Sequence, residues 1–182
     1  RSEAYVDTSN GLPPVYWQGC LWGGKVPNVC AMIDELEARV NRDLENNIVA
    51  LWHDESQINR YFLERITDVH TLGSEYAFTL KLNVPMVLFI TEDLVEFVEE
   101  RRKDIPTDII IQTVEDIPYY KLKDKIQGIL DSDRYKEDIS DPDRIECQQA
   151  MYSIIQYSKF PWLEQAIENN PHESEFFFWI DA

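Results

Sequence analysis

Four consecutive side chains in this sequence could do chemistry: Trp52, His53, Asp54 and Glu55. They follow a short apolar run at residues 48–51, and α/β enzymes often place reactive groups where an apolar strand ends. A carboxylate can act as a nucleophile or as a strong hydrogen-bond acceptor, and an indole offers a flat apolar face beside an N–H donor. The alternative is a solvated helix start, with Asp54 as the N-cap and Glu55 favoured by the helix dipole.

Hydrophobic periodicity predicts the elements that would position these residues. Apolar residues at helical spacing predict helices over 28–44 and 54–66, separated by a short buried strand or extended segment at 48–51. Beyond about Gly73, strands predicted at 83–90, 109–111 and 175–180 alternate with helices over 93–103, 120–130, 144–157 and 161–168. In the helix over 93–103 we expect Leu94, Phe97 and Val98 to face inward, and Pro161 is expected to separate the last two helices. Such alternation indicates an α/β fold with a parallel-type sheet.

Composition and charge exclude several classes of protein. The chain of 182 residues is 44% hydrophobic, which is enough to build a core. Its net charge of −17 argues against non-specific nucleic-acid binding and against attraction to anionic membranes. No apolar run approaches the length of a membrane span, and the three cysteines form no CxxC pair. We therefore expect no nucleic-acid partner, no membrane segment and no zinc site.

Two longer strings carry a family resemblance. Residues 52–63 read WHDESQINRYFL and resemble the WHDESHLNKYL signature of glycosyltransferase family 6, the family of the ABO blood-group transferases and the α1,3-galactosyltransferases. Residues 16–24 read YWQGCLWGG and resemble that family's YYxGGFFGG segment, in wording closer to its bacterial members. The resemblance covers about residues 1–76. It implies a GT-A-like fold of the nucleotide-diphospho-sugar transferases, and retaining transfer of galactose or N-acetylgalactosamine from a UDP-sugar donor to an acceptor glycan hydroxyl.

The same resemblance implies roles for the residues of the first string. Glu55 would be the catalytic carboxylate, acting on the face of the donor sugar opposite the leaving group, as retention requires. Asp54 would bind hydroxyls of the donor sugar, His53 would contact donor or acceptor sugar, and Trp52 would contact the acceptor. Taken alone, Trp52 would more often be a core residue than a ligand contact, at roughly two to one.

The second string implies a donor-discriminating site. Gln18, Gly19 and Cys20 fall where members of the family distinguish a C2 acetamido group from a hydroxyl. Bulk at such positions sets selectivity of about 1–3 kcal/mol. Cys20 replaces a small Gly or Ala of the mammalian pattern, so the choice between galactose and N-acetylgalactosamine does not carry over directly. A packed, buried thiol is the alternative for Cys20.

The second half carries a different resemblance. Segments that read VPMVLF, YYKLKDK, YSKFPWL and FFWIDA, at residues 84–89, 119–125, 157–163 and 177–182, resemble the HtrL/YibB family. The predicted organisation is therefore the C-terminal part of a family 6-like domain at 1–76, followed by the N-terminal part of an HtrL/YibB-like α/β domain at 77–182. Because incomplete domains have no reason to share a core, we expect few packing contacts between the two halves.

The two ends of the sequence lead to two further expectations, a metal ligand at Asp181 and truncation of the domain. Asp181 ends a very apolar run and could bind Mg²⁺ or Mn²⁺ beside a diphosphate, or could cap the next element. The chain begins without Met, and the family's DxD (or bacterial NxN) segment would lie upstream of residue 1. We expect both ends to be cut, and therefore weak or no nucleotide-sugar binding by residues 1–182.

Two other functions stay open from sequence. One is a non-catalytic carbohydrate-binding or structural remnant of a transferase. The other is a glycoside hydrolase using Asp54 and Glu55, which ranks last because adjacent residues of an extended segment point to opposite faces.

Overall fold

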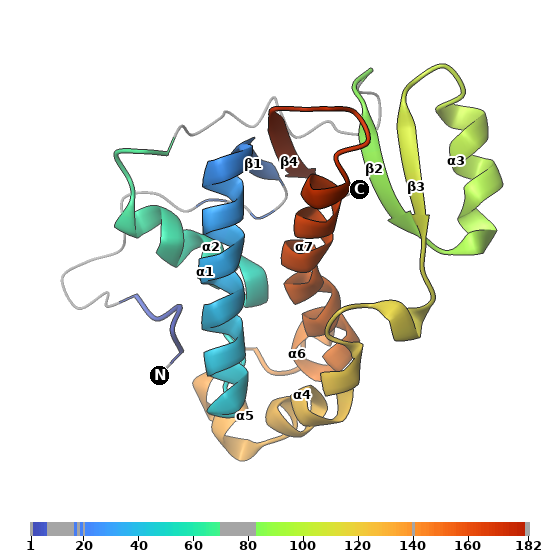
Figure 1. Cartoon of the computed structure of the whole chain (residues 1–182). Helices are drawn as coiled ribbons and strands as arrows, with labels where there is room; N and C mark the ends of the chain where they lie inside the picture. Colours follow the sequence, from blue (N-terminus) through green and yellow to red (C-terminus); the bar gives the residue numbers. More distant parts are fainter. Residues whose placement is uncertain are drawn as a thin grey trace.

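Two long helices, α1 (Val26–Glu45) and α7 (Ala150–Asn169), lie side by side at the centre of the fold (Figure 1). The computed structural model describes residues 2–6, 17, 19, 21–69, 83–139 and 141–180. The other helices within the described residues are α2 (His53–Glu64), α3 (Val95–Arg101), α4 (Lys123–Leu130), α5 (Asp133–Asp138) and α6 (Ile145–Gln148). Short 3₁₀ turns lie at Glu92–Leu94, Val114–Asp116 and Tyr120–Leu122. The strands are β1 (Leu21–Lys25), β2 (Met86–Ile90), β3 (Thr107–Ile111) and β4 (Phe176–Ile180).

The core lies between α1 and α7 and draws on both halves of the chain. Leu36 of α1, Ile58 of α2, Ile126 of α4 and Ile154 and Phe160 of α7 are fully buried in one hydrophobic cluster. Helix α1 is amphipathic, and its buried positions recur every three or four residues along one face. A face of that width needs a partner helix, and α7 supplies it.

A second link between the halves is the antiparallel pair β1–β4. Leu21 pairs with Ile180 and Lys25 with Phe176, so residues from near the two ends of the chain form one ladder. Together with the common core, this pairing shows that the expectation of few packing contacts between the halves is wrong. The apolar faces of α1 and α7 cover each other, and neither half buries its own face alone. The different family origins of residues 1–76 and 77–182 stay a prediction.

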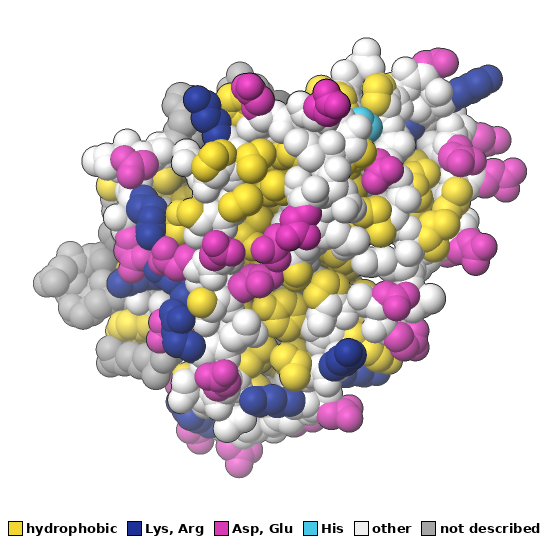
Figure 2. All heavy atoms as spheres, in the orientation of Figure 1, with side chains coloured by type: hydrophobic (Ala, Val, Ile, Leu, Met, Phe, Trp, Pro, Cys, Tyr) yellow, Lys and Arg dark blue, Asp and Glu magenta, His cyan; other side chains and the backbone are white. Residues whose placement is uncertain are grey.

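The parallel pair β2–β3, with α3, forms a second layer beside α7 (Figure 1). Trp162 of α7 joins it to the centre: its ring stacks between Phe89 and Trp179, with centroids 5.7 and 6.2 Å away, and its Nε1–H donates to Gln112 Oε1 at 2.8 Å. The prediction that Leu94 and Phe97 face inward is wrong. Their side chains are 44% and 51% exposed, whereas Val98 is half-buried. Acidic side chains are scattered over the face in Figure 2, with exposed apolar side chains among them.

Most predicted elements are confirmed, and four features differ. Residues 48–51 form no strand; Val49 and Ala50 are buried, whereas Leu51 lies in an exposed turn. Helix α7 runs through Pro161, so the predicted break is wrong; burial of Phe160 and Trp162 on either side offsets the lost backbone hydrogen bond. Residues 131–143, whose charged sequence predicts a loop, contain α5, and its N-cap Ser132 accepts the N–H of Tyr135. A mixed α/β content is confirmed, but the described strands form two two-stranded sheets in place of one parallel sheet.

The β1–β4 pair gives a test of how the halves are joined. A Cβ added at Gly23 would lie 2.1 Å from Phe177 O and 2.5 Å from the Cα of Phe178, so Gly23→Ala must push the strands apart. We expect a loss of roughly 1–3 kcal/mol in the free energy of unfolding, measured by urea denaturation. Gly24→Ala is the matched control, because its Cβ would meet only Val29 Cγ2 at 3.9 Å. Equal stability of the two variants would contradict the pairing.

Candidate functional site

The first turn of α2 begins with an unusual backbone conformation. His53 has a φ of 44°, a left-handed value that non-glycine residues seldom adopt. Its N–H donates to Ala50 O at 3.1 Å, and the N–H of Trp52 donates to Ser56 Oγ at 2.9 Å. Such strain persists only where the surroundings impose it, and it is common at functional sites. Here it sends the side chains of residues 52–55 in different directions.

Glu55 meets the segment around Gly19. The backbone N–H of Gly19 donates to Glu55 Oε1 at 2.7 Å. A Cβ at Gly19 would lie 2.7 Å from Glu55 Cγ and 3.2 Å from Asp54 Oδ2, so only glycine fits at this distance. The structure therefore brings one residue of the predicted donor-discriminating set against both carboxylates of the predicted site.

Asn59 holds the same segment from the next turn of α2. Its Oδ1 accepts the N–H of Trp17 at 2.8 Å, and its Nδ2 donates to Trp17 O at 2.7 Å and to Glu55 O at 2.9 Å. The ring of Trp17 also packs edge-on against Phe62, with centroids 5.5 Å apart. Our sequence reasoning missed Asn59 as a functional residue. The available signal was a carboxamide four positions after Glu55, on the same side of a predicted helix.

Asp54 is paired with a cation from the other half of the chain. Lys159 Nζ of α7 lies 2.9 Å from Asp54 Oδ2, and the two side chains are 5% and 3% exposed. Burying either charge alone would cost several kcal/mol. Sequence reasoning missed Lys159. A lysine between apolar residues of a helix is a weak signal for such a partner, because lysine is almost never fully buried unless paired.

His53 points into the protein and not towards the solvent. It is 3% exposed, and its ring centroid lies 5.2 Å from that of Tyr152 and 6.1 Å from that of Tyr157. Among the described residues, no partner meets strict hydrogen-bond geometry at either ring nitrogen, although the backbone of Glu146 is near enough to interact with the ring. Burial lowers the pKa of His53 to about 4, although Glu146 acts in the opposite direction. In this structure His53 is a neutral group that supports the helix start; direct contact with a sugar stays a prediction that this burial does not favour.

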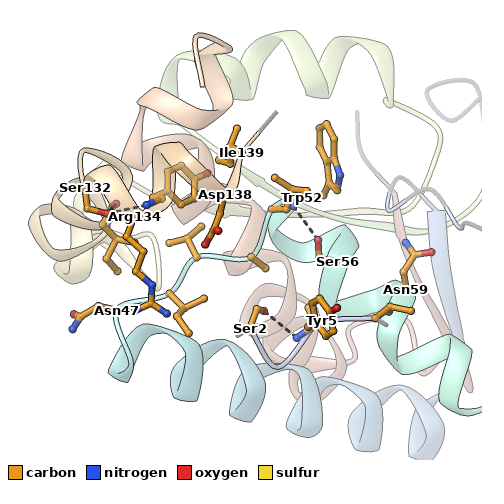
Figure 3. A pocket seen from close by; sticks show the side chains of 18 of the residues that line it. Ser2, Tyr5, Asn47, Trp52, Ser56, Asn59, Ser132, Arg134, Asp138 and Ile139 are labelled. Atoms are coloured by element: carbon orange, nitrogen blue, oxygen red, sulfur yellow. Dashed lines mark hydrogen bonds between the residues drawn. The ribbon is translucent and has the colours of Figure 1, made fainter. Parts of the chain in front are cut away.

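Trp52 borders the cavity shown in Figure 3. Its indole is 38% exposed, and the guanidinium of Arg144 lies 4.5 Å from the ring centroid. The cavity has a volume of about 700 Å³ and lies between residues 2–6, the 47–52 segment, one side of α2, and α4 with α5. His53, Asp54 and Glu55 do not line it, so the described part of the site has two sides: the Glu55–Gly19 contact and the Trp52 cavity.

The remaining predicted site residues, Gln18, Cys20 and Asp181, lie outside the described residues. Within 2–6, 17, 19, 21–69, 83–139 and 141–180, no group of three His, Cys, Asp or Glu side chains could hold a metal ion. A metal site stays a prediction that depends on Asp181.

The Asp54–Lys159 pair makes a prediction about stability. Lys159→Met leaves a buried carboxylate without its cation, and we expect the free energy of unfolding to fall by roughly 3–5 kcal/mol. Adding Asp54→Asn should recover much of that loss, as a double-mutant cycle in urea denaturation would measure. Lys125→Met, at an exposed lysine of α4, is the control and should change stability by less than about 0.5 kcal/mol. A Lys159 variant as mild as this control would contradict the pairing.

The buried His53 makes a prediction about pH. Its folded pKa of about 4 lies below the ordinary value of 6.5, so the unfolded chain binds the proton more readily. The stabilising contribution is therefore complete above pH 6.5 and is lost as the pH falls towards 4. Between pH 7.5 and 5 we expect the wild type to lose about 2 kcal/mol more than His53→Asn, in which this titration is absent. Asparagine suits the control because it tolerates a positive φ. Parallel losses in both proteins would show that His53 does not titrate as described.

Comparison with known proteins places this site in a family. The profile of glycosyltransferase family 6 matches residues 1–101. Histo-blood group ABO system transferase 1 of Rattus norvegicus is 33% identical over 82 residues, which cover 45% of this chain and 23% of that protein. Histo-blood group ABO system transferase 2 of the same organism is 35% identical over 63 residues, which cover 35% of this chain and 18% of that protein.

These matches thus span at most about a quarter of each curated relative. No solved structure matches the chain, so a GT-A-like architecture stays a prediction. Among the described residues, no helix has the length and apolar character needed to cross a membrane. The matched residues 1–101 are more than half of the chain and contain both Gly19 and Glu55; the chain belongs to glycosyltransferase family 6.

Proposed function

We propose that this chain carries the catalytic carboxylate and the acceptor side of a retaining hexosyltransferase. The reaction would move galactose or N-acetylgalactosamine from a UDP-sugar to an acceptor glycan hydroxyl. One observation carries the proposal: the Gly19 N–H lies 2.7 Å from Glu55 Oε1, where a side chain on residue 19 could not fit. Two motifs that are far apart in the sequence thus meet at the carboxylate that the chemistry needs.

Glu55 has the chemistry that retention requires. A carboxylate can attack the anomeric carbon as UDP departs, and the acceptor hydroxyl then displaces it, so that two inversions give retention. It can also stabilise an oxocarbenium-like state without forming a bond. In either case the carboxylate must be held in place, and the Gly19 hydrogen bond fixes its orientation on a rigid helix.

Lys159 and Asp54 set the charge around Glu55. Two adjacent carboxylates, Asp54 and Glu55, repel each other, and the buried Lys159 ammonium offsets that repulsion at Asp54. Asp54 is also held in one position by this ion pair. We infer that the buried Asp54–Lys159 pair positions the start of α2 beside Glu55; direct contact of Asp54 with the donor sugar stays a prediction that its burial does not favour.

The alternative is a carbohydrate-binding protein without catalysis. The observation that favours it is the location of the cavity, which lies on the Trp52 side and is not lined by Glu55. Trp52 could then bind a sugar that the chain never transfers. The two functions differ in whether Glu55 affects turnover, and the next experiment separates them.

We predict that Glu55→Gln lowers turnover far more than it weakens donor binding. The amide keeps the shape of the side chain but lacks the negative charge that faces the transition state. In the longest natural polypeptide that contains these residues, we expect kcat to fall by on the order of 10²–10³. Calorimetric titration with UDP-galactose and UDP-N-acetylgalactosamine, with and without Mn²⁺, should give nearly unchanged affinities.

Glu96→Gln is the matched control, because Glu96 also lies in the first turn of a helix but is exposed and distant in sequence. Its turnover should equal that of the wild type. If Glu55→Gln keeps full turnover as well, Glu55 is a helix-start residue and the catalytic assignment is wrong. If the wild type binds sugars but transfers none, the carbohydrate-binding alternative holds.

A further inference from the structure

The layer formed by β2, β3 and α3 contains no fully buried residue. Every residue from 83 to 118 is half-buried or exposed, although the two strands consist mostly of apolar side chains. Parallel strands of this composition are normally covered by the rest of a fold. Near their carboxyl ends in the sequence, Leu94, Ile111 and Val114 are among the exposed large apolar residues of the chain. This layer therefore has apolar surface that a partner could cover.

The two faces of the β2–β3 pair already have neighbours, whereas the outer edge of β3 does not. Phe89 stacks on Trp162 of α7 on one face, and Thr107 and Ile109 line a hollow with Val98 of α3 on the other. The pair accordingly lies between α7 and α3 in Figure 1. Among the described residues, β2 is the only strand that pairs with β3. The unpaired edge presents backbone N–H and C=O groups that an added strand can bind.

The register shows which backbone groups of β3 face outward. The N–H of Gln112 donates to Ile90 O at 2.9 Å, towards β2. Successive residues of a strand direct these groups to opposite edges. The N–H groups of Ile109 and Ile111 therefore point away from β2, and no hydrogen bond to either is present within the described residues. Two such donors in alternate positions suit the main-chain pairing of strand addition.

The side chains along this edge define what an added strand contains. Ile109 and Ile111 point to the α3 face, whereas Asp108 between them points to the opposite face. A strand beside β3 would thus place alternate side chains next to apolar groups and next to a carboxylate. Residues 92–116 contain nine Asp or Glu and three Lys or Arg, so the surroundings also favour a cation.

We propose that the outer edge of β3 binds an extended basic segment of a partner protein, in which Lys or Arg alternates with apolar residues. Charge argues against a second copy of this chain as the occupant, because each copy carries −17. The inference does not depend on the proposed transferase activity. It assigns a separate interaction surface to the half of the chain that lies mostly beyond the family-matched residues 1–101.

Three matched peptides of about seven residues, the length of a short strand, test the proposal. One alternates Lys with Val, one alternates Glu with Val, and one alternates Lys with Ser; both ends are capped. We expect the Lys–Val peptide to bind the whole chain at least tenfold more tightly than either control, measured by fluorescence anisotropy. Its affinity should fall between about 0.05 and 0.3 M salt. Hydrogen exchange of residues 107–111 should slow when it binds.

The variant Ile111→Pro removes one outward N–H, which is not used in pairing with β2. It should weaken binding of the Lys–Val peptide at least tenfold. Ile111→Thr is the matched control, because it keeps the N–H and a β-branched side chain, and its affinity should stay within about threefold of the wild type. Asp108→Lys keeps the whole backbone edge and should weaken the Lys–Val peptide while it strengthens the Glu–Val peptide. Circular dichroism and urea unfolding would show that each variant is folded.

Each other outcome overturns the inference. Equal binding of the Lys–Val and Lys–Ser peptides would show a general attraction between charges. Unchanged binding by the folded Ile111→Pro and Asp108→Lys variants would place the peptide elsewhere. A dimer of the wild type in sedimentation, converted to monomer by Ile111→Pro, would make a second copy the occupant of the edge. None of these results bears on Glu55, so the proposed function is judged separately.

Discussion

The buried ion pair between Lys159 and Asp54 is the contact on which the candidate site depends. Two charges that are less than 6% exposed can stay inside a protein only as partners. The pair joins the first turn of α2 to the middle of α7, so the start of α2 cannot move away from the central helices. Glu55 is the next residue, and its position relative to Gly19 follows from the same constraint. A change in α7 would therefore reach Glu55 without touching it.

The side chains of the motif at residues 52–63 point in different directions from the start of α2, and each contacts a different part of the protein. Asp54 points to Lys159, Glu55 points to Gly19, and Asn59 clamps the backbone of Trp17. Ile58 enters the core, while Trp52 faces the cavity. A helix presents successive residues about 100° apart, and the strained backbone at residue 53 adds to this spread. The spacing of the motif thus reflects the different neighbours that one short segment must contact.

Local patterns predicted the local structure well. The helices α1 and α2 and the strands β2, β3 and β4 lie where periodicity and apolar runs predicted them, because each pattern concerns residues a few positions apart. Failures came where the outcome depends on what covers an element. Phe97 has an inward pattern, but in the structure it is 51% exposed, with the Arg101 guanidinium over its ring. Pro161 was expected to end a helix, but Phe160 and Trp162 on either side of it are buried and the helix continues. The two strands of the β1–β4 pair are separated by most of the sequence, and the residue pattern of neither strand indicates which strand it pairs with.

In the candidate site, too, the sequence predicted the residues within the motifs but not a contact with a distant segment. Family resemblance grouped Gly19 with Asp54 and Glu55, and the structure brings the three together, although their chemical roles stay predictions. Lys159 could not be predicted, because it lies 105 positions from Asp54 and belongs to a segment with a different resemblance.

Lys159, the cation that pairs with Asp54, lies beyond the family-matched residues 1–101. A buried aspartate at the start of α2 needs a cation, and residues 1–101 do not supply the one seen here. Any relative that keeps the motif but lacks an equivalent of α7 must place another cation, or a ligand hydroxyl, at Asp54. In this chain the first turn of α2 is therefore complete only through a contact with a residue that lies beyond the family-matched segment.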